Sequence, residues 1–407
     1  MATSFDRIIK KCQKDWEAPE LMTSAFTVSG NKLPFSSPLL NWCTYGGIPR
    51  NRITEFFGYP GGGKTSTSID ICKNAMDIFK QEYEAKHAEY SEKAAIGKKE
   101  YVGLLEDLEE VGPKKILYID LENAFDVKWA TTLGMDKEEI TSEDSIFKIM
   151  TPPNIVAEDI LQTTQEIIAS NEVGLVVLDS VPTLVPRLEL EKKIGERTVA
   201  ALAGILSVWL RKIVPMLTRH DCTLILINQV RDNMDNPWDV KTPGGNAPKF
   251  YSSLRVLFQV GRPVDRFGNE LKMSAENPDG YIINAKLIKQ KSAPSDRKIG
   301  TYFLMAHEGI RPDFDYAKLA INKYQCIKKS GGWFLVCDPF TGEVLEDEDG
   351  KEKKLHGLPK VYEFLQTNTE YYDTLKRFVN EDLNGEDASV DAEEVLVGDE
   401  ELAYYES

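Results

Sequence analysis

The residues with the clearest chemistry lie in one glycine-rich segment. Residues 58–65 read GYPGGGKT, with the spacing G-x-x-x-x-G-K-T, and directly follow an apolar segment at 53–57 that is typical of a strand. In such a loop the backbone N–H groups surround phosphate oxygens, a lysine adds positive charge, and a hydroxyl can bind Mg²⁺. A helix that begins near the lysine adds the positive end of its dipole. The segment predicts a nucleotide site with Mg²⁺, formed by Gly58, Gly61, Gly62, Gly63, Lys64, Thr65 and Ser66.

Two acidic strand ends could complete this site. Four apolar residues at 175–178 precede Asp179, a pattern typical of a strand whose terminal carboxylate holds Mg²⁺ through water. The segment 120–126 follows another apolar strand and reaches the same edge of the sheet, so Glu122 is the predicted general base for an attacking water. Asp126 is a further candidate for contact with the nucleotide. A solvated loop carboxylate or a helix cap is the alternative for both residues, and it is stronger for Asp126.

Composition places the chain among ordinary globular proteins. It has 407 residues and a net charge of −16, but residues 381–407 hold eleven acidic residues and no Lys or Arg, which leaves −5 for the rest. That tail has too little apolar content to fold. Six Cys without a C-x-x-C spacing and four His without H-E-x-x-H indicate neither a zinc site nor a disulfide framework. Without a secretory signal or a long apolar segment, the sequence predicts a cytoplasmic protein with no membrane partner.

The elements that must position these residues alternate along the chain. Short apolar segments typical of strands occur at 53–57, 115–120, 175–179, 222–228, 254–260 and 281–288. Helices are expected at 65–79, 155–169 and 199–218. This alternation predicts an α/β fold with a mostly parallel, twisted sheet flanked by helices. The charged segment 81–115 is interpreted as a helical insertion on the surface.

Whole motifs resemble RecA-type homologous recombinases over residues 39–309. The segments that carry the resemblance are GGIPRNRITE at 46–55, DLENAFD at 120–126, LDSVP at 178–182, LINQVR at 226–231 and GGNAPKFY at 244–251. The last of these is the most family-specific string in the chain. The chain departs from the family at Asn51, where a glycine is usual.

The resemblance implies a RecA-type P-loop ATPase core with ATP and Mg²⁺ as cofactors. Glu122 matches the catalytic glutamate, Trp129 the aromatic residue that stacks on adenine, and Gln229 the residue that senses the γ-phosphate and signals to DNA. Lys289 and Lys291 match a lysine pair that reaches the γ-phosphate of a neighbouring subunit, which implies an ATP site shared between protomers. The alternative for these two is a pair of solvated strand-end lysines.

The same match implies two DNA-binding loops, at 189–197 and 232–243. Cations beside an aromatic side chain suit single-stranded DNA, because they neutralise phosphates while bases stack on the ring. The implied DNA-binding residues are Lys192, Lys193, Arg197, Arg211, Trp238, Lys241, Gly244, Gly245 and Asn246. Gly204 stands where the family has a DNA-contacting arginine. The alternative is a polar loop surface in which the glycines are plain turn residues.

The resemblance also suggests a division of the chain into four parts. They are an N-terminal polymerisation element at 1–38, an ATPase core at 39–310 with the insertion at about 81–115, a smaller α+β accessory module at 311–380, and an acidic disordered tail at 381–407. The insertion is absent from typical bacterial members and the module matches poorly, which is more typical of a phage-encoded relative than of a housekeeping bacterial enzyme. The tail resembles the family's self-inhibitory C-terminus, with plain solubility as the alternative.

The implied function is DNA strand exchange in homologous recombination and repair. The chain would be a DNA-dependent ATPase that forms helical filaments on single-stranded DNA, with Glu122, Lys64 and Gln229 as catalytic residues. Its partners would be single- and double-stranded DNA, further copies of the chain, and single-strand-binding and mediator proteins. A RecA-fold ring helicase or clock-type motor ATPase is the alternative; the string at 244–251 and the lack of a primase-binding domain favour the recombinase. A small-molecule P-loop kinase, which would need an arginine-rich lid, and a non-enzymatic mediator that binds ATP as an assembly switch are further alternatives.

Overall fold

The computed structural model describes residues 4–15, 32–193, 200–230 and 242–384. The chain divides into two compact units, Met1–Lys32 and Leu33–Ser407. The spacing of the apolar residues 5, 8, 9, 12 and 16 predicts a short amphipathic helix, and the first unit contains it as α1 (Ser4–Asp15). The sequence also predicts a brief extended segment at 25–28, which lies outside the described residues.

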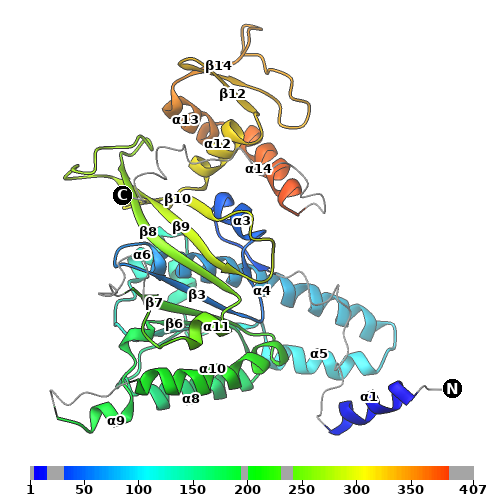
Figure 1. The fold of residues 1–407 in the computed structure, drawn as a ribbon. Helices are drawn as coiled ribbons and strands as arrows, with labels where there is room; N and C mark the ends of the chain where they lie inside the picture. Colours follow the sequence, from blue (N-terminus) through cyan, green and yellow to red (C-terminus); the bar gives the residue numbers. More distant parts are fainter. Residues whose placement is uncertain (1–3, 16–31, 194–199, 231–241, 385–407) are drawn as a thin grey trace. The chain divides into compact units, whose positions relative to one another are not determined.

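A nine-stranded sheet forms the centre of the second unit, in the order β11-β10-β9-β8-β3-β7-β6-β4-β5 (Figure 1). Its strands are β3 (Ile53–Gly58), β4 (Lys115–Asp120), β5 (Phe147–Met150), β6 (Val173–Asp179), β7 (Thr223–Gln229), β8 (Leu254–Val264), β9 (Gly280–Gln290), β10 (Ile299–Met305) and β11 (Gly309–Ile310). The five pairings from β8 to β5 are parallel, and the three from β8 to β11 are antiparallel. The predicted mostly parallel α/β sheet is therefore confirmed.

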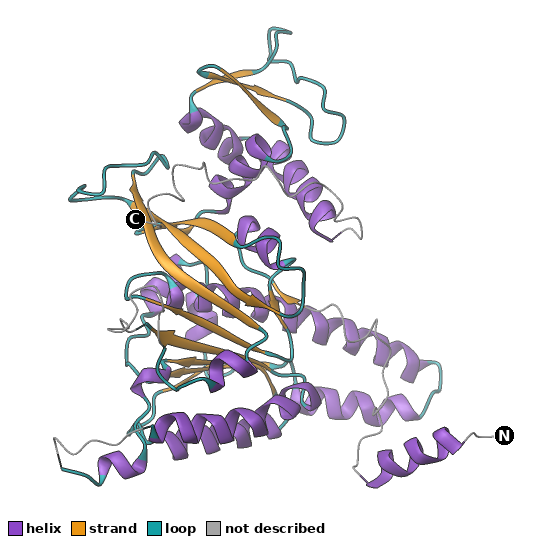
Figure 2. Cartoon of the chain, in the orientation of Figure 1, coloured by secondary structure: helices purple, strands orange, loops and turns teal. Residues whose placement is uncertain are grey.

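Helices cover both faces of this sheet (Figure 2). The first part of α4 (Lys64–Ala95) packs on one face, and α8 (Ala157–Ala169) and α10 (Ala201–Arg219) pack on the other. Strands β3, β4, β6 and β7 lie between these layers and are buried along nearly their whole length. Burial on both faces explains why their sequences are almost continuously apolar rather than alternating.

The remaining elements of this core are short. They are β1 (Lys32–Leu33), α3 (Pro38–Thr44), β2 (Ile48–Pro49), α5 (Glu100–Val111), α6 (Val127–Thr132), α7 (Lys137–Thr141), the 3₁₀ turn η1 (Val181–Thr183), α9 (Arg187–Leu190) and α11 (Ala247–Tyr251).

By length and composition, α10 alone among the described helices could cross a membrane. Its side chains Leu206, Leu210 and Ile213 are fully buried in the core cluster that also contains residues of β6 and β7. These side chains form the face of α10 that packs in the core, whereas Val208 is exposed.

The charged segment 81–115 contains the second half of α4 together with α5. The buried side chains of α4 end at Phe79, although the helix continues to Ala95, and in α5, which is described in full, no side chain is buried. The two segments pack on each other through ring contacts such as Tyr90 with Tyr101. They form a helical hairpin at the surface of the protein.

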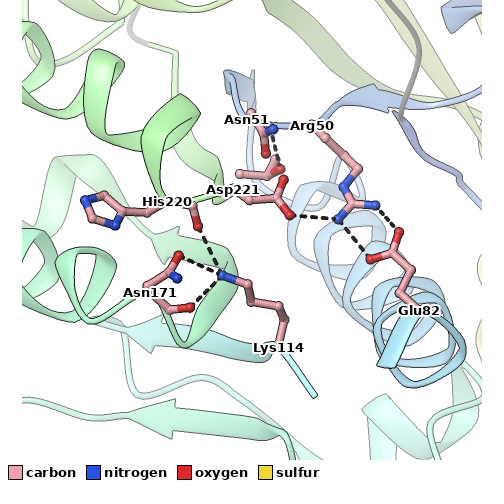
Figure 3. Close-up of polar contacts among 8 residues, drawn as sticks. Arg50, Asn51, Glu82, Lys114, Asn171, His220 and Asp221 are labelled. Carbon is pink, nitrogen blue, oxygen red and sulfur yellow. Dashed lines mark hydrogen bonds and ion pairs between the residues drawn. The ribbon is translucent and has the colours of Figure 1, made fainter. Parts of the chain in front are cut away.

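Two cations fix the base of this hairpin to the core (Figure 3). The guanidinium of Arg50 pairs with Glu82 of α4 and lies 3.6 Å from Asp221, just before β7. Beside it, Asn51 has a φ of 60°, a left-handed conformation that asparagine tolerates better than most residues. A glycine, the usual residue of the family at this position, adopts the same conformation without strain.

The second cation is Lys114, which lies where the hairpin returns to β4. Its ammonium donates to the carbonyl oxygen of His220 at 3.2 Å and to Oδ1 of Asn171 at 3.1 Å (Figure 3). Burial lowers the pKa of Lys114. The hairpin is thus attached to the core at both of its ends.

Residues beyond β11 form a smaller α+β module. It contains α12 (Pro312–Asn322), a three-stranded antiparallel sheet of β12 (Ile327–Ser330), β13 (Trp333–Val336) and β14 (Lys354–His356), and helices α13 (Leu358–Thr367) and α14 (Thr369–Asn384). A third core cluster joins it to the large sheet, with Phe303 of β10 edge-to-face against Phe314 of α12 at 5.0 Å.

A buried carboxyl group lies at this junction. Asp315 of α12 is fully buried and accepts a 2.5 Å hydrogen bond from the hydroxyl of Ser37, which caps α3. Desolvation raises the pKa of Asp315 to about 8, although Ser37 and Lys318 oppose the shift. The group is therefore protonated in the folded protein at neutral pH and ionised in the unfolded chain.

This difference predicts a pH dependence of stability. Between about pH 4 and pH 8 the folded state binds one proton more than the unfolded state, so the free energy of unfolding falls as pH rises, by about 1.4 kcal/mol per pH unit from this group. Asp315→Asn keeps an oxygen that accepts from Ser37 but cannot titrate. Urea unfolding at pH 5, 6 and 7 should give a shallower decline for the variant, and equal slopes would contradict the assignment.

Candidate active site

Four parallel strands bring the predicted chemistry to one edge of the sheet. β3 ends at Gly58, β4 at Asp120, β6 at Asp179 and β7 at Gln229. Since these strands are parallel neighbours, their carboxyl ends meet on the same side. The phosphate loop and the segments after β4, β6 and β7 consequently lie together.

The phosphate loop requires glycine at positions that the motif fixes. At Gly58, with φ 151°, a Cβ would lie 2.1 Å from the carbonyl oxygen of Phe258; at Gly63, with φ 84°, it would lie 2.6 Å from the hydroxyl of Tyr302. The ammonium of Lys64, the first residue of α4, donates to the carbonyl oxygens of Gly58 at 3.1 Å and Tyr59 at 2.8 Å. Burial lowers the pKa of Lys64, while the nearby carboxylates Asp179 and Glu122 oppose this shift.

A pair of hard oxygen donors lies beside the loop. The hydroxyl of Thr65 donates to Oδ2 of Asp179 at 2.9 Å, and the hydroxyl of Tyr118 donates to the same oxygen at 2.6 Å. Desolvation raises the pKa of Asp179, and both hydrogen bonds act in the opposite sense. A hydroxyl and a carboxylate at a phosphate loop fit Mg²⁺, which prefers few protein oxygens together with phosphate oxygens.

Glu122 lies on the segment after β4 and faces the end of β7. Its Oε1 accepts hydrogen bonds from the hydroxyl of Ser180 and, at 3.3 Å, from Nε2 of Gln229. The buried carboxylate of Asp120 holds this segment in place by accepting from the backbone N–H groups of Ala124 at 3.2 Å and Phe125 at 2.9 Å. The structure thus brings the predicted base and the predicted sensor into contact.

Trp129 and Asp126 take different positions on α6. The indole N–H of Trp129 donates to the hydroxyl of Ser66 at 3.1 Å, which places the ring next to the phosphate loop. Asp126 caps α6 by accepting from the backbone N–H of Lys128 at 2.7 Å and of Trp129 at 3.4 Å. This is the helix-cap geometry that was the alternative for Asp126, and its contact with a nucleotide stays a prediction.

Lys289 and Lys291 lie at the end of β9, against the end of α11. Lys289 donates to the carbonyl oxygens of Lys249 at 2.5 Å and Phe250 at 3.0 Å, and Lys291 donates to that of Phe250 at 3.4 Å. Burial, and then the nearby charges of Lys291 and Arg255, lower the pKa of Lys289 to about 8. In the single chain the two lysines cap a helix.

The predicted DNA-binding residues are only partly described. Lys192 and Lys193 follow α9, and Arg211 is exposed on α10. Gly244 and Gly245 have φ values of 87° and 72°, and Asn246 precedes α11. Arg197, Trp238 and Lys241 lie outside the described residues, as do residues 194–197 of the first predicted loop and most of the second. A contact of any of these residues with DNA stays a prediction.

Three polar residues of the site were not predicted from the sequence. Tyr118 and Ser180 contact Asp179 and Glu122, and Asn228, the neighbour of Gln229, is fully buried. Tyr118 carried a weak signal, because it precedes Asp120 by two residues and such residues of a strand share a face. Asn228 stands out only as a polar residue after the apolar run 224–227.

The sequence of this chain is similar to that of known recombinases. The sequence model of the RecA N-terminal domain matches residues 105–311. Protein RecA of Thermus aquaticus is 30% identical over 328 residues, which cover 79% of this chain and 78% of the relative. Protein RecA of Aquifex aeolicus is 29% identical over 365 residues (88% and 86%), and the chromosomal Protein RecA of Lactococcus lactis is 28% identical over 366 residues (86% and 81%).

The resemblance inferred from the motifs is thereby confirmed, and the fold agrees with it. The matched segment includes β4, β6 and β7, whose carboxyl ends carry Asp120, Asp179 and Gln229. The chain belongs to the RecA family of homologous recombinases.

Proposed function

We propose that the protein is a DNA-dependent ATPase that polymerises on single-stranded DNA, pairs it with a homologous duplex and exchanges the strands. Membership of the RecA family gives the chain a role in DNA recombination and repair. The observation that best supports the finer proposal is the contact between Glu122 and Gln229 at the edge that also holds the phosphate loop. This contact links Glu122, the proposed base for hydrolysis, to Gln229, the residue that the family resemblance implies signals to DNA.

The geometry supports a division of tasks around ATP. The loop 58–65 and the beginning of α4 would bind the phosphates, with Lys64 supplying positive charge at the β and γ groups. Thr65 and Asp179 would hold Mg²⁺, which neutralises developing charge during phosphoryl transfer. Glu122 would orient and deprotonate the attacking water. Trp129 and Ser66, in contact with each other, would bound the side of the site next to the phosphate loop.

The DNA side of the proposal uses the segments next to β7 and α10. Arg211 on α10 and the lysines after α9 would contact phosphates, and Gly244 to Asn246 would bring backbone N–H groups close to the strand. The two lysines that cap α11 lie beside this segment. Helical assembly would present them to the γ-phosphate of a neighbouring protomer.

The proposal is tested by measuring ATP hydrolysis with and without single-stranded DNA and imaging the same mixtures by negative-stain electron microscopy. DNA-stimulated hydrolysis together with helical filaments is the expected result. Closed rings, or turnover that does not respond to DNA, would instead favour a motor ATPase or a kinase.

Lys289→Ala is expected to lower DNA-stimulated turnover by at least about tenfold, because a transition-state charge contact is lost. ATP binding by single protomers should change little, since the lysine would act on the neighbour. Lys286→Ala, which removes an exposed lysine of the same strand to which no role is assigned, is the control.

A mixing experiment makes this prediction specific to a shared site. Protomers with Lys289→Ala retain Lys64, and protomers with Lys64→Ala retain Lys289. In a head-to-tail filament formed from equal amounts, about a quarter of the interfaces combine both intact residues, so the mixture should recover activity that neither variant has alone. No recovery would argue against a site shared in this way.

A further inference from the structure

Three neighbouring central strands each place one polar side chain on the same face of the sheet. Glu55 of β3 is fully buried, Asn228 of β7 is fully buried, and Arg255 of β8 is 6% exposed. On one side of its strand, Glu55 pairs with Leu226 of β7, and Leu226 precedes Asn228 by two residues. On the other side, Glu55 pairs with Arg255 of β8. Residues two apart in a strand share a face, so the three side chains converge in the core rather than at the surface.

Their hydrogen bonds form one connected network. Nδ2 of Asn228 donates to Oε1 of Glu55 at 3.0 Å, and Nε of Arg255 donates to Oε2 of Glu55 at 2.5 Å. The guanidinium also lies over the ring of Phe57, 4.5 Å from its centroid. Each oxygen of the buried carboxylate therefore has a donor, and its charge has a partner, as a buried ion requires.

Asn228 extends this network to two functional segments. Its Nδ2 also donates to the carbonyl oxygen of Pro243 at 3.0 Å, and its Oδ1 accepts from the backbone N–H of Gln229 at 3.0 Å. An amide side chain has two N–H groups and one oxygen, and all of them are used here. One side chain thus fixes the backbone of Gln229 relative to the segment 243–246, which contains Gly244, Gly245 and Asn246.

We propose that Asn228 is a positioning residue that couples the nucleotide-sensing glutamine to the DNA-binding segment 243–246 through its hydrogen bond to Pro243. A shift of Gln229 when its partner Glu122 engages ATP is transmitted through Asn228 to the carbonyl of Pro243. Glu55 and Arg255 anchor the amide so that it cannot rotate away. This inference rests on the function proposed above, and it adds a residue with no direct contact to ATP or DNA.

An exchange of the amide and the carboxylate isolates the bond to Pro243. In the double variant Glu55→Gln with Asn228→Asp, the new amide at 55 donates to the new carboxylate at 228, its oxygen accepts from Arg255, and the network keeps one negative charge in total. The carboxylate at 228 also still accepts from the N–H of Gln229. It has no hydrogen to donate to Pro243 and repels that carbonyl oxygen, so this contact is broken, while the bonds that join residues 55, 228 and 255 and the N–H of Gln229 keep a donor and an acceptor each.

The experiment measures the affinity for a fluorescent oligothymidylate with ATP and with ADP, together with kcat and KM for ATP and the midpoint of thermal unfolding. We expect the double variant to unfold near the wild-type temperature and to keep its KM for ATP within about twofold. Its ATP-dependent gain in DNA affinity should fall by at least about tenfold, within the usual range of a coupling between two sites. Gln229→Ala provides the reference for an uncoupled protein.

The control is Asn74→Asp, which loses the same kind of bond elsewhere. Nδ2 of Asn74, on α4, donates to the carbonyl oxygen of Pro34 at 2.9 Å, in a part of the core that the proposal does not use. This variant should retain the full ATP-dependent gain in DNA affinity. Should the double variant not fold, Asn228→Ala, which adds no charge, is measured and judged by the same criterion.

The outcomes separate this inference from the function it rests on. A folded double variant with a full ATP-dependent gain, while Gln229→Ala has lost it, would show that Asn228 serves stability alone and would overturn the inference. A wild-type protein whose DNA affinity does not respond to ATP would overturn the proposed function, and the inference with it.

Discussion

Lys64→Ala is expected to reduce ATP turnover by about 10²–10³-fold or more, the effect of removing one charged group that stabilises a transition state. The lysine is held by the carbonyl oxygens of Gly58 and Tyr59 at the start of α4, where its ammonium can meet the β and γ phosphates. Alanine has no group that replaces this charge, while the backbone N–H groups of the loop remain. ATP hydrolysis in the presence of DNA and binding of a fluorescent ATP analogue measure the two effects separately.

Lys73→Ala is the matched control for this variant. Lys73 lies on the same helix, and its ammonium bonds the hydroxyl of Ser36 at 2.9 Å. It also lies 3.7 Å from the carboxylate of the buried Asp70, so its removal costs stability away from the phosphate loop. Turnover per folded protein should stay within about twofold of the wild type, and thermal unfolding of the variant measures the folded fraction. Turnover by Lys64→Ala at the wild-type rate would show that the loop does not bind the reacting phosphates.

Glu122→Gln is expected to lower kcat by about 10²–10⁴-fold and to leave ATP binding nearly unchanged, the signature of a lost general base. Both hydrogen bonds to Glu122, from Ser180 and Gln229, go to Oε1. A glutamine keeps an oxygen that can accept them, so the variant loses basicity with little change in geometry. Filaments formed with ATP should therefore persist instead of turning over.

Single-turnover hydrolysis, with the lifetime of filaments on DNA measured by electron microscopy, tests this prediction. Glu138→Gln, an exposed carboxylate in the first turn of α7, is the control and should behave as the wild type. Equal turnover by Glu122→Gln and the wild type would remove the residue from the role of base and direct attention to other carboxylates at this edge.

Much of the fold could be predicted because the central strands are buried on both faces. Their apolar runs marked β3, β4, β6 and β7 within two residues of the observed bounds. β10 was not predicted. Its sequence IGTYFLM has a glycine and a threonine near its start, which leaves only a short apolar run. The direction of β9 could not be predicted, because the 15 residues at 265–279 that join it to β8 are enough for either a hairpin or a crossover; the structure shows the antiparallel pairing.

The residues of the site that belong to a sequence motif could be predicted. The residues whose role depends on burial and on contacts between distant strands could not. Lys64, Thr65, Asp179, Glu122 and Gln229 came from motifs, and the structure brings them to one edge. The network of Glu55, Asn228 and Arg255 has no motif, because its residues come from three strands that are far apart in sequence. A glutamate inside the apolar run ITEFF was the single hint, since a buried charge needs partners that only the tertiary structure can supply.

The length of α4 has a mechanical consequence. The helix begins at the lysine of the phosphate loop and extends for 32 residues, about 48 Å at 1.5 Å per residue. Arg50 holds it at Glu82, so the 13 residues beyond that pivot form a stiff lever of about 20 Å. The other arm, from Lys64 to Glu82, is 18 residues or about 27 Å long. A tilt of the helix about the pivot on phosphate binding would therefore move the tip of the surface hairpin in the opposite direction, by about three-quarters of the movement at the loop, and would carry the state of the nucleotide to the outside of the molecule.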